Sequence, residues 1–178
     1  MEHELQTCSE RYSAIQVLLH WVSAVVILWT LISAGYVLLF AGGTPLAAVI
    51  ADFNVALTTL FIPLFIWRFW LRCTSPSRGG EPDGVARMVH LLLYGFTALV
   101  LLSGVLMMER PIDLFGWLQI PQLLQAPAWS QGFSVLHRLA SLVLALLVVL
   151  HILAVIWHEC LGRRVLWRMQ IKRRGGRD

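Results

Sequence analysis

The charged residues of this chain are confined to short segments, and the long stretches between them contain no Asp, Glu, Lys or Arg. Such stretches separate residues 11 and 52, 52 and 68, 87 and 109, and 138 and 159. A helix needs roughly 20 apolar residues to cross the hydrocarbon core of a bilayer. The sequence Ala-Gly-Gly-Thr-Pro at residues 41–45 is a turn signal that divides the first stretch between two helices. The pattern predicts four membrane-spanning helices, at residues 15–40, 46–71, 84–108 and 133–161.

A soluble domain with a large core and a cleaved signal peptide are the two alternatives to this interpretation. Only 13% of the residues are charged and 58% are hydrophobic, whereas about a quarter of the residues in soluble domains are charged. The first apolar segment is too long for a signal peptide, and no Ala-x-Ala cleavage pattern follows a basic start. We therefore expect one all-α domain over residues 1–178, an integral membrane four-helix bundle.

The basic residues indicate the orientation of the bundle. Arg72, Arg78 and Arg87 lie in the connection between the second and third predicted helices, and residues 162–178 form a basic tail. The other two connections contain Arg110 alone. Because Lys and Arg accumulate on the cytoplasmic side of membrane proteins, both termini are predicted to be cytoplasmic. Such a tail favours anionic lipid headgroups, and not nucleic acid, as its partner.

Five of the six histidines lie within the predicted spans or at their ends, where ionisable groups are costly and usually mark function. His137 and His151 are 14 residues apart in the fourth predicted helix. This spacing corresponds to a rise of about 21 Å and a rotation of roughly 40°. Both histidines therefore share one face of the helix but lie near opposite membrane surfaces, so that they suit two separate cofactors and not one metal ion.

Depth in the membrane pairs His151 with a histidine of the first helix. His20 lies about 8 Å, and His151 about 12 Å, from the cytoplasmic surface. Cofactor sites in the core of a helix bundle are formed by side chains on facing helices. A haem b fits because the chain has no Cys-x-x-Cys-His motif for covalent attachment, and zinc would usually require four ligands. We predict that His20 and His151 bind the iron of an inner haem b.

The outer half of the bundle lacks a matching histidine for His137. The facing part of the second helix reads Ala-Asp-Phe-Asn-Val at residues 51–55, and Asn54 is a poor iron ligand. An outer haem on His137 would be five-coordinate, would use Met107 or Met108, or would be absent. The residues thus predict one haem and leave a second one open.

Several sequence features resemble the bacterial cytochrome b561 family, which includes the small superoxide oxidases. The family is related to the cytochrome b subunits of membrane hydrogenases and formate dehydrogenases. The similarity extends from about Arg11 to Arg174. It is carried by Leu-His-Trp at residues 19–21, Trp-Arg-Phe-Trp-Leu-Arg at 67–72, His90 with Leu-Leu-Leu-Tyr after it, Gly-Val-Leu-Met-Met at 104–108, and the pair His137 and His151.

The resemblance implies a four-helix bundle in the bacterial inner membrane with two haems b. One haem is held by the first and fourth helices and the other by the second and fourth. By position, His20 and His151 correspond to the inner pair and His137 to the outer pair, while Asn54 stands where the family has histidine. Family members exchange electrons with ubiquinone, and superoxide oxidases take an electron from superoxide at the periplasmic side.

Three more side chains are candidates for the inner site. His90 follows Arg87 near the cytoplasmic end of the third helix, and its imidazole can bond a quinone carbonyl or a haem propionate. His158 lies seven residues beyond His151, displaced by only about 20° around the helix, where it can assist proton transfer to quinone. For both, a plain interfacial histidine is the alternative. Arg68 suits a propionate, or it extends to the lipid headgroups.

Three functions are consistent with these residues. The first is electron transfer between haem b and membrane quinone, with superoxide:quinone oxidoreductase as its specific form. The second is a cytochrome b anchor subunit for a separate redox partner protein. The third is a ligand-binding haem protein with an open outer site.

Overall fold

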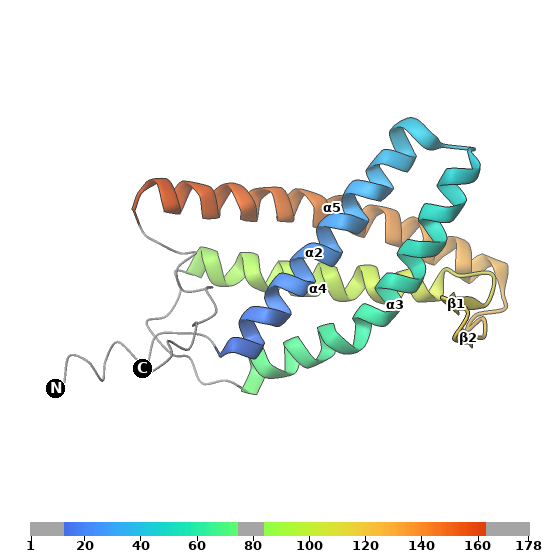
Figure 1. Ribbon diagram of the computed structural model, residues 1–178, viewed down its shortest axis with the longest axis horizontal. Helices are drawn as coiled ribbons and strands as arrows, with labels where there is room; N and C mark the ends of the chain where they lie inside the picture. Colours follow the sequence, from blue (N-terminus) through green and yellow to red (C-terminus); the bar gives the residue numbers. More distant parts are fainter. Residues whose placement is uncertain (1–12, 75–83, 163–178) are drawn as a thin grey trace, which may run out of the picture.

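The computed structural model describes residues 13–74 and 84–162, and these residues form a bundle of long helices (Figure 1). A π-helical segment, Val37–Ala41, prolongs the first helix. All four helices are long and apolar enough to cross a membrane, which confirms the predicted spans. The helices are α2 (Ala14–Tyr36), α3 (Pro45–Thr74), α4 (Gly84–Leu106) and α5 (Pro127–Cys160).

Local sequence signals explain where the first two helices begin and end. A capping box starts α2, because the Ser13 hydroxyl accepts a hydrogen bond from the Gln16 backbone and the Gln16 side chain accepts one from the Ser13 backbone. The connection to α3 turns at Gly43, whose φ of +79° is easily adopted only by glycine. Pro45 then begins α3, as proline often does at the first helical position. The predicted Gly/Pro turn is therefore present.

The fourth helix is longer than predicted, since α5 begins at Pro127 and not near residue 133. Its first turns contain the polar residues Ser130 and Gln131, so hydrophobicity alone does not reveal them. At 34 residues, α5 is about 51 Å long, well beyond the roughly 30 Å of a hydrocarbon core. Part of α5 must therefore extend into the headgroup region or beyond.

A short β-hairpin occupies the connection between α4 and α5. Strand β1 (Ile112–Leu114) pairs antiparallel with β2 (Leu118–Ile120), with Ile112 opposite Ile120. Phe115 and Gly116 both have positive φ values, as the tightest hairpin turns require. The sequence analysis did not predict this hairpin. Its buried residues Ile112 and Leu114 pack against Ala56 of α3 and so close one end of the bundle.

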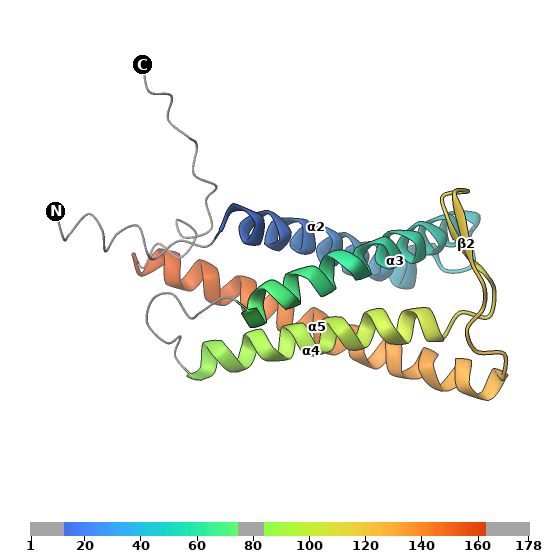
Figure 2. The same ribbon diagram turned by 90° about the horizontal axis from the view of Figure 1, so that it is seen from below.

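The helices pack as two pairs, α2 with α3 and α4 with α5, which form two layers in Figure 2. An apolar cluster between the pairs consists of Phe61 and Phe65 of α3 and Leu101 of α4. Most other large apolar side chains point outward; Leu38, for example, is 83% exposed. This surface suits lipid, in which helices satisfy their own backbone hydrogen bonds.

Candidate cofactor site

Three histidines from three helices meet at the end of the bundle where α2 begins and α5 ends. The rings of His90 on α4 and His151 on α5 lie edge to face, with their centroids 5.4 Å apart. His20 on α2 lies at the same end of the bundle (Figure 1), where its Nδ1 is hydrogen-bonded to Arg68 of α3. The structure thus places His20, His90 and His151 at one end of the bundle, with His90 and His151 in ring contact; the pairing of His20 and His151 as haem ligands stays a prediction.

Arg68 of α3 completes this cluster, so that all four helices contribute a side chain. Its Nη2 lies 2.9 Å from Nδ1 of His20, and its guanidinium carbon lies 5.1 Å from the ring centroid of Tyr94. Guanidinium can only donate, so Nδ1 of His20 accepts, and a neutral His20 carries its proton on Nε2. The Tyr94 ring attracts the same cation through its face. Arg68 is therefore turned toward the imidazole of His20.

His90 has the opposite proton arrangement. Its Nδ1 lies 2.6 Å from the carbonyl oxygen of Ala86. A carbonyl only accepts, so Nδ1 donates, and the lone pair of a neutral ring remains on Nε2. Histidines that bind metals commonly have their second nitrogen fixed in this way. His90 is thus chemically able to be a ligand, a role that the sequence analysis did not consider.

Tyr94 is a residue of this cluster that the sequence analysis missed. It lies four residues after His90, and residues at this spacing are neighbours on one helix face. Besides Arg68, it contacts Phe65 and Phe69, with ring centroids 6.0 Å and 5.9 Å away. The His-x-x-x-Tyr spacing was the available signal, but only the packing of α3 on α4 shows that this face points into the bundle.

His158 lies in the last turn of α5, seven residues beyond His151. Its Nδ1 is buried and has no hydrogen-bond partner among the described residues. Buried polar atoms are nearly always bonded to protein or water. This nitrogen is therefore available to a bound polar group.

His137 lies in the other half of the bundle and is turned toward α4. Its Nδ1 lies 3.1 Å from the carbonyl oxygen of Val100 and 3.3 Å from the hydroxyl of Ser103. Gly104 allows this approach, because a Cβ atom there would be 3.2 Å from Cε1 of His137. The imidazole is thus held against the backbone of α4.

Replacing Gly104 with valine should lower the stability of the protein by about 1–3 kcal/mol, the usual cost of overpacking. The new side chain would press on the His137 ring and separate α4 from α5. Gly95→Val is the matched control on the same helix, since nothing lies within 4 Å of a Cβ built at Gly95. Thermal unfolding in detergent, followed by tryptophan fluorescence, measures both. Equal melting temperatures for the two variants would contradict this packing.

Both the nitrogen and the oxygen of the Asn54 side-chain amide form hydrogen bonds with side chains of α2. Its Nδ2 donates to the hydroxyl of Ser33 at 2.8 Å, and its Oδ1 accepts from Nε1 of Trp29 at 3.1 Å. The side chain therefore connects α3 to α2 in the outer half of the bundle. None of its hydrogen bonds reaches His137.

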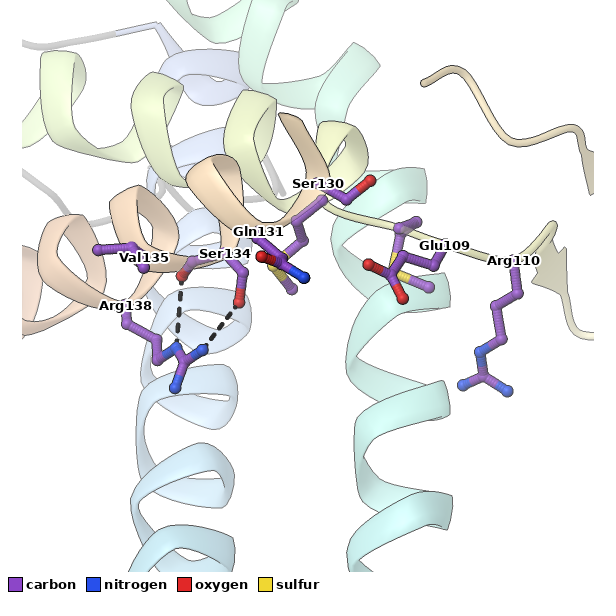
Figure 3. Close-up of a pocket in the computed structure, with 9 residues that line it drawn as sticks. Glu109, Arg110, Ser130, Gln131, Ser134, Val135 and Arg138 are labelled. Carbon is purple, nitrogen blue, oxygen red and sulfur yellow. Dashed lines mark hydrogen bonds between the residues drawn. The ribbon is translucent and has the colours of Figure 1, made fainter. Parts of the chain in front are cut away.

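The two methionines considered as alternative ligands lie at the end of α4. Met107 and Met108 both line a pocket near the start of α5, and Met108 also packs against the cluster formed by Ala56, Ile112 and Leu114. Met108 thus packs beside the hairpin, and both methionines share their pocket with the charged residues Glu109, Arg110 and Arg138 (Figure 3).

The two halves of the bundle differ in how well they fit a haem. Around His20 and His151, imidazoles from different helices lie beside a guanidinium, a donor set that suits an iron porphyrin with a propionate. No group of three or more His, Cys, Asp or Glu side chains in residues 13–74 and 84–162 is arranged to hold a bare metal ion. Within the described residues, no second imidazole contacts His137, and Asn54 of α3 is already bonded to α2. The outer half does not fit a second bis-histidine haem.

Comparison with protein families agrees with the helical arrangement and the histidine pattern. A model of the prokaryotic cytochrome b561 family matches residues 11–170, nearly the whole chain. A comparison with curated proteins found no match. The chain is therefore a member of the prokaryotic cytochrome b561 family, multi-pass membrane proteins that transfer electrons through haem b.

Proposed function

We propose that this cytochrome binds one haem b between His20 and His151 and exchanges electrons with a membrane quinone. The observation that carries the proposal is the convergence of His20, Arg68 and His151 from three helices at one end of the bundle. Haem held by two imidazoles supplies one-electron transfer at an iron without an open position. Burial in the bundle tunes its potential.

Arg68 has two partners in this proposal. A neutral imidazole that binds iron through Nε2 carries its proton on Nδ1, so it can no longer accept a hydrogen bond from the guanidinium there. Arg68 then needs another acceptor, and a haem propionate matches its planar geometry. Tyr94 holds the guanidinium near both partners.

His158 and His90 are the proposed quinone-side residues. The buried Nδ1 of His158 can donate to a quinone carbonyl, which would supply its missing partner. His90 is exposed and touches His151, so it lies between the proposed haem ligand and the surface. Quinone reduction takes up protons, and histidine is the side chain best suited to pass them near neutral pH.

The basic residues support an orientation with this site near the cytoplasm. Arg72 lies in the last turn of α3, and Arg87 lies in the first turn of α4 at the same end of the bundle. Arg78 and the tail at residues 163–178 belong to the predicted basic regions but lie outside the described residues. By the positive-inside rule, both termini face the cytoplasm of a bacterial inner membrane.

Reoxidation of the reduced haem by a short-chain ubiquinone tests this function. The purified holoprotein is reduced with dithionite, freed of excess reductant and mixed with quinone in a stopped-flow spectrometer. His158→Ala should slow reoxidation about 100-fold, the lower range for loss of a positioned proton donor. His137→Ala, on the same helix, should leave the rate unchanged. A wild-type haem that quinone cannot oxidise would contradict the proposal.

The electron donor separates the specific forms of this function. A superoxide:quinone oxidoreductase would convert two superoxide ions, one quinone and two protons into two dioxygen molecules and one quinol. Stoichiometric quinol formation by the purified chain with superoxide would establish that activity. A chain that is inert alone but active with a co-purified dehydrogenase would instead be an anchor subunit.

A further inference from the structure

The β-hairpin between α4 and α5 crosses the end of the bundle from the α4–α5 layer to the α2–α3 layer (Figure 2). Because side chains alternate along a strand and paired residues share a face, one face carries four apolar residues: Ile112, Leu114, Leu118 and Ile120. This face packs against the helices, since Ile112 and Leu114 are buried against Ala56 of α3. Asp113 and Gln119 pair on the opposite face and are exposed. The hairpin is therefore amphipathic, with its polar face directed away from the helices.

The turn of this hairpin carries two aromatic side chains that the protein leaves uncovered. Phe115 is 51% exposed and Trp117 is 93% exposed. Phe115 also has a φ of +55°, a conformation that glycine, asparagine and aspartate adopt far more readily than an aromatic residue. The backbone of the turn thus gives no reason for a phenylalanine at this position, which points to a role for the ring outside the hairpin.

Hydrogen bonds within the turn fix the place of these two rings. The backbone N–H of Trp117 donates to the carbonyl oxygen of Leu114 at 3.1 Å. The backbone N–H of Gly116 donates to the carboxylate of Asp113 at 2.9 Å. The tip of the hairpin, defined as Phe115 and Trp117, is therefore held at the end of two paired strands.

The tip continues an aromatic row that extends over α2 and α3. Phe115 lies edge to face with Phe53 of α3, with ring centroids 5.8 Å apart. Phe53 lies in the same way against Trp29 of α2, with centroids 5.7 Å apart. Phe53 and Trp29 are themselves exposed on helices that are long and apolar enough to cross the membrane. The tip is therefore continuous with the surface that these helices present to lipid.

The distribution of charge at this end of the bundle also favours lipid as the environment of the tip. Residues 114–124 contain no charged side chain, whereas the charged residues Glu109, Arg110 and Arg138 line the pocket beside the hairpin (Figure 3). Tryptophan is enriched at the level of the lipid headgroups, where its ring meets lipid and its N–H meets polar groups. We propose that Phe115 and Trp117 insert into the headgroup region of the leaflet opposite the histidine cluster and anchor the hairpin to the membrane.

Photo-crosslinking from the tip tests this anchor and distinguishes lipid from a protein partner. The variant Trp117→benzoylphenylalanine keeps an aromatic ring at the tip and, on irradiation in bacterial membranes, bonds covalently to C–H groups within its reach. Mass spectrometry of the purified chain should show an increase equal to the mass of one phospholipid. Phe115→benzoylphenylalanine repeats the test from the other ring of the tip. Leu38→benzoylphenylalanine is the reference for a lipid-facing side chain, since Leu38 is 83% exposed on the prolonged first helix.

Gln119→benzoylphenylalanine is the matched control, because Gln119 lies two residues from Trp117 on the polar face of the hairpin. It should give no lipid adduct. A protein adduct at residue 117 would make the tip a docking site for another chain and overturn the lipid assignment. Absence of a lipid adduct at both residues 115 and 117 would place the tip in water and contradict the proposal. Equal lipid adducts at residues 117 and 119 would also overturn it, since both faces of the hairpin would then lie in lipid.

Discussion

His151→Ala should yield a folded membrane protein that retains almost no haem after purification. Even the hydrogen-bond partners of metal ligands are worth about 10- to 100-fold in affinity, so loss of a ligand should cost at least as much. His20→Ala should have the same effect, because the two imidazoles would hold one iron from α2 and α5. The pyridine haemochrome assay gives haem per chain, and tryptophan fluorescence confirms that each variant is folded.

His90→Ala and His137→Ala are the controls for this experiment. The ring centroid of His90 lies 5.4 Å from that of His151, and a neutral His90 has its lone pair on Nε2, so His90 is placed to compete as a ligand. If His90→Ala loses haem while His20→Ala retains it, the ligand pair is His90 and His151. His137→Ala should keep the wild-type haem content, since its ring is bonded to α4 in the other half.

The wild-type protein should contain one haem per chain, and the Asn54→His variant should contain nearly two. The carboxamide of Asn54 offers iron no good ligand and is bonded to Ser33 and Trp29. An imidazole at residue 54 would supply the partner for His137 that the resemblance of the sequence implies. Because the expected change is a doubling, haem per chain measured against protein by amino-acid analysis resolves it.

The double variant Asn54→His with His137→Ala should return to one haem, which shows that the gained haem depends on both imidazoles. A ratio of two in the wild type would contradict the interpretation of the outer half. Addition of carbon monoxide to the reduced wild type checks the same point. A bis-histidine haem should keep its spectrum, whereas a five-coordinate haem on His137 should change it.

These predictions depend on a difference between the two halves of the bundle in the side chains that connect their helices. Near the first turns of α2, charged and ionisable side chains converge, and no carboxylate in residues 13–74 and 84–162 forms an ion pair with Arg68. This arrangement favours a cofactor with carboxylates. In the other half, Asn54, Ser33 and Trp29 bond directly across α2 and α3. Buried polar networks whose members are all bonded make packing specific. This half therefore has its own side-chain connection between α2 and α3.

Much of this organisation could be predicted from the sequence alone. Long apolar stretches with few or no charges predicted the four helices, because a helix satisfies its own backbone hydrogen bonds in the absence of water. The turn between α2 and α3 was predictable from Gly43 and Pro45, since their backbone preferences are intrinsic. The depth of His20 and His151 followed from helical rise, which is constant.

Contacts between helices could only be known from the tertiary structure. The rotation of α3 and α4 about their own axes determines that Arg68 contacts His20 and that Tyr94 faces the interior of the bundle. Because these helices are apolar on nearly all sides, their sequences do not indicate such rotations. The hairpin packs on α3, and the pocket beside it is formed by residues that follow α4 and residues of α5, segments that are brought together only in the folded chain. The helical repeat is a local property of the backbone, so composition and spacing predict it. The partners of each side chain depend on how neighbouring helices fit together, so composition and spacing do not predict them.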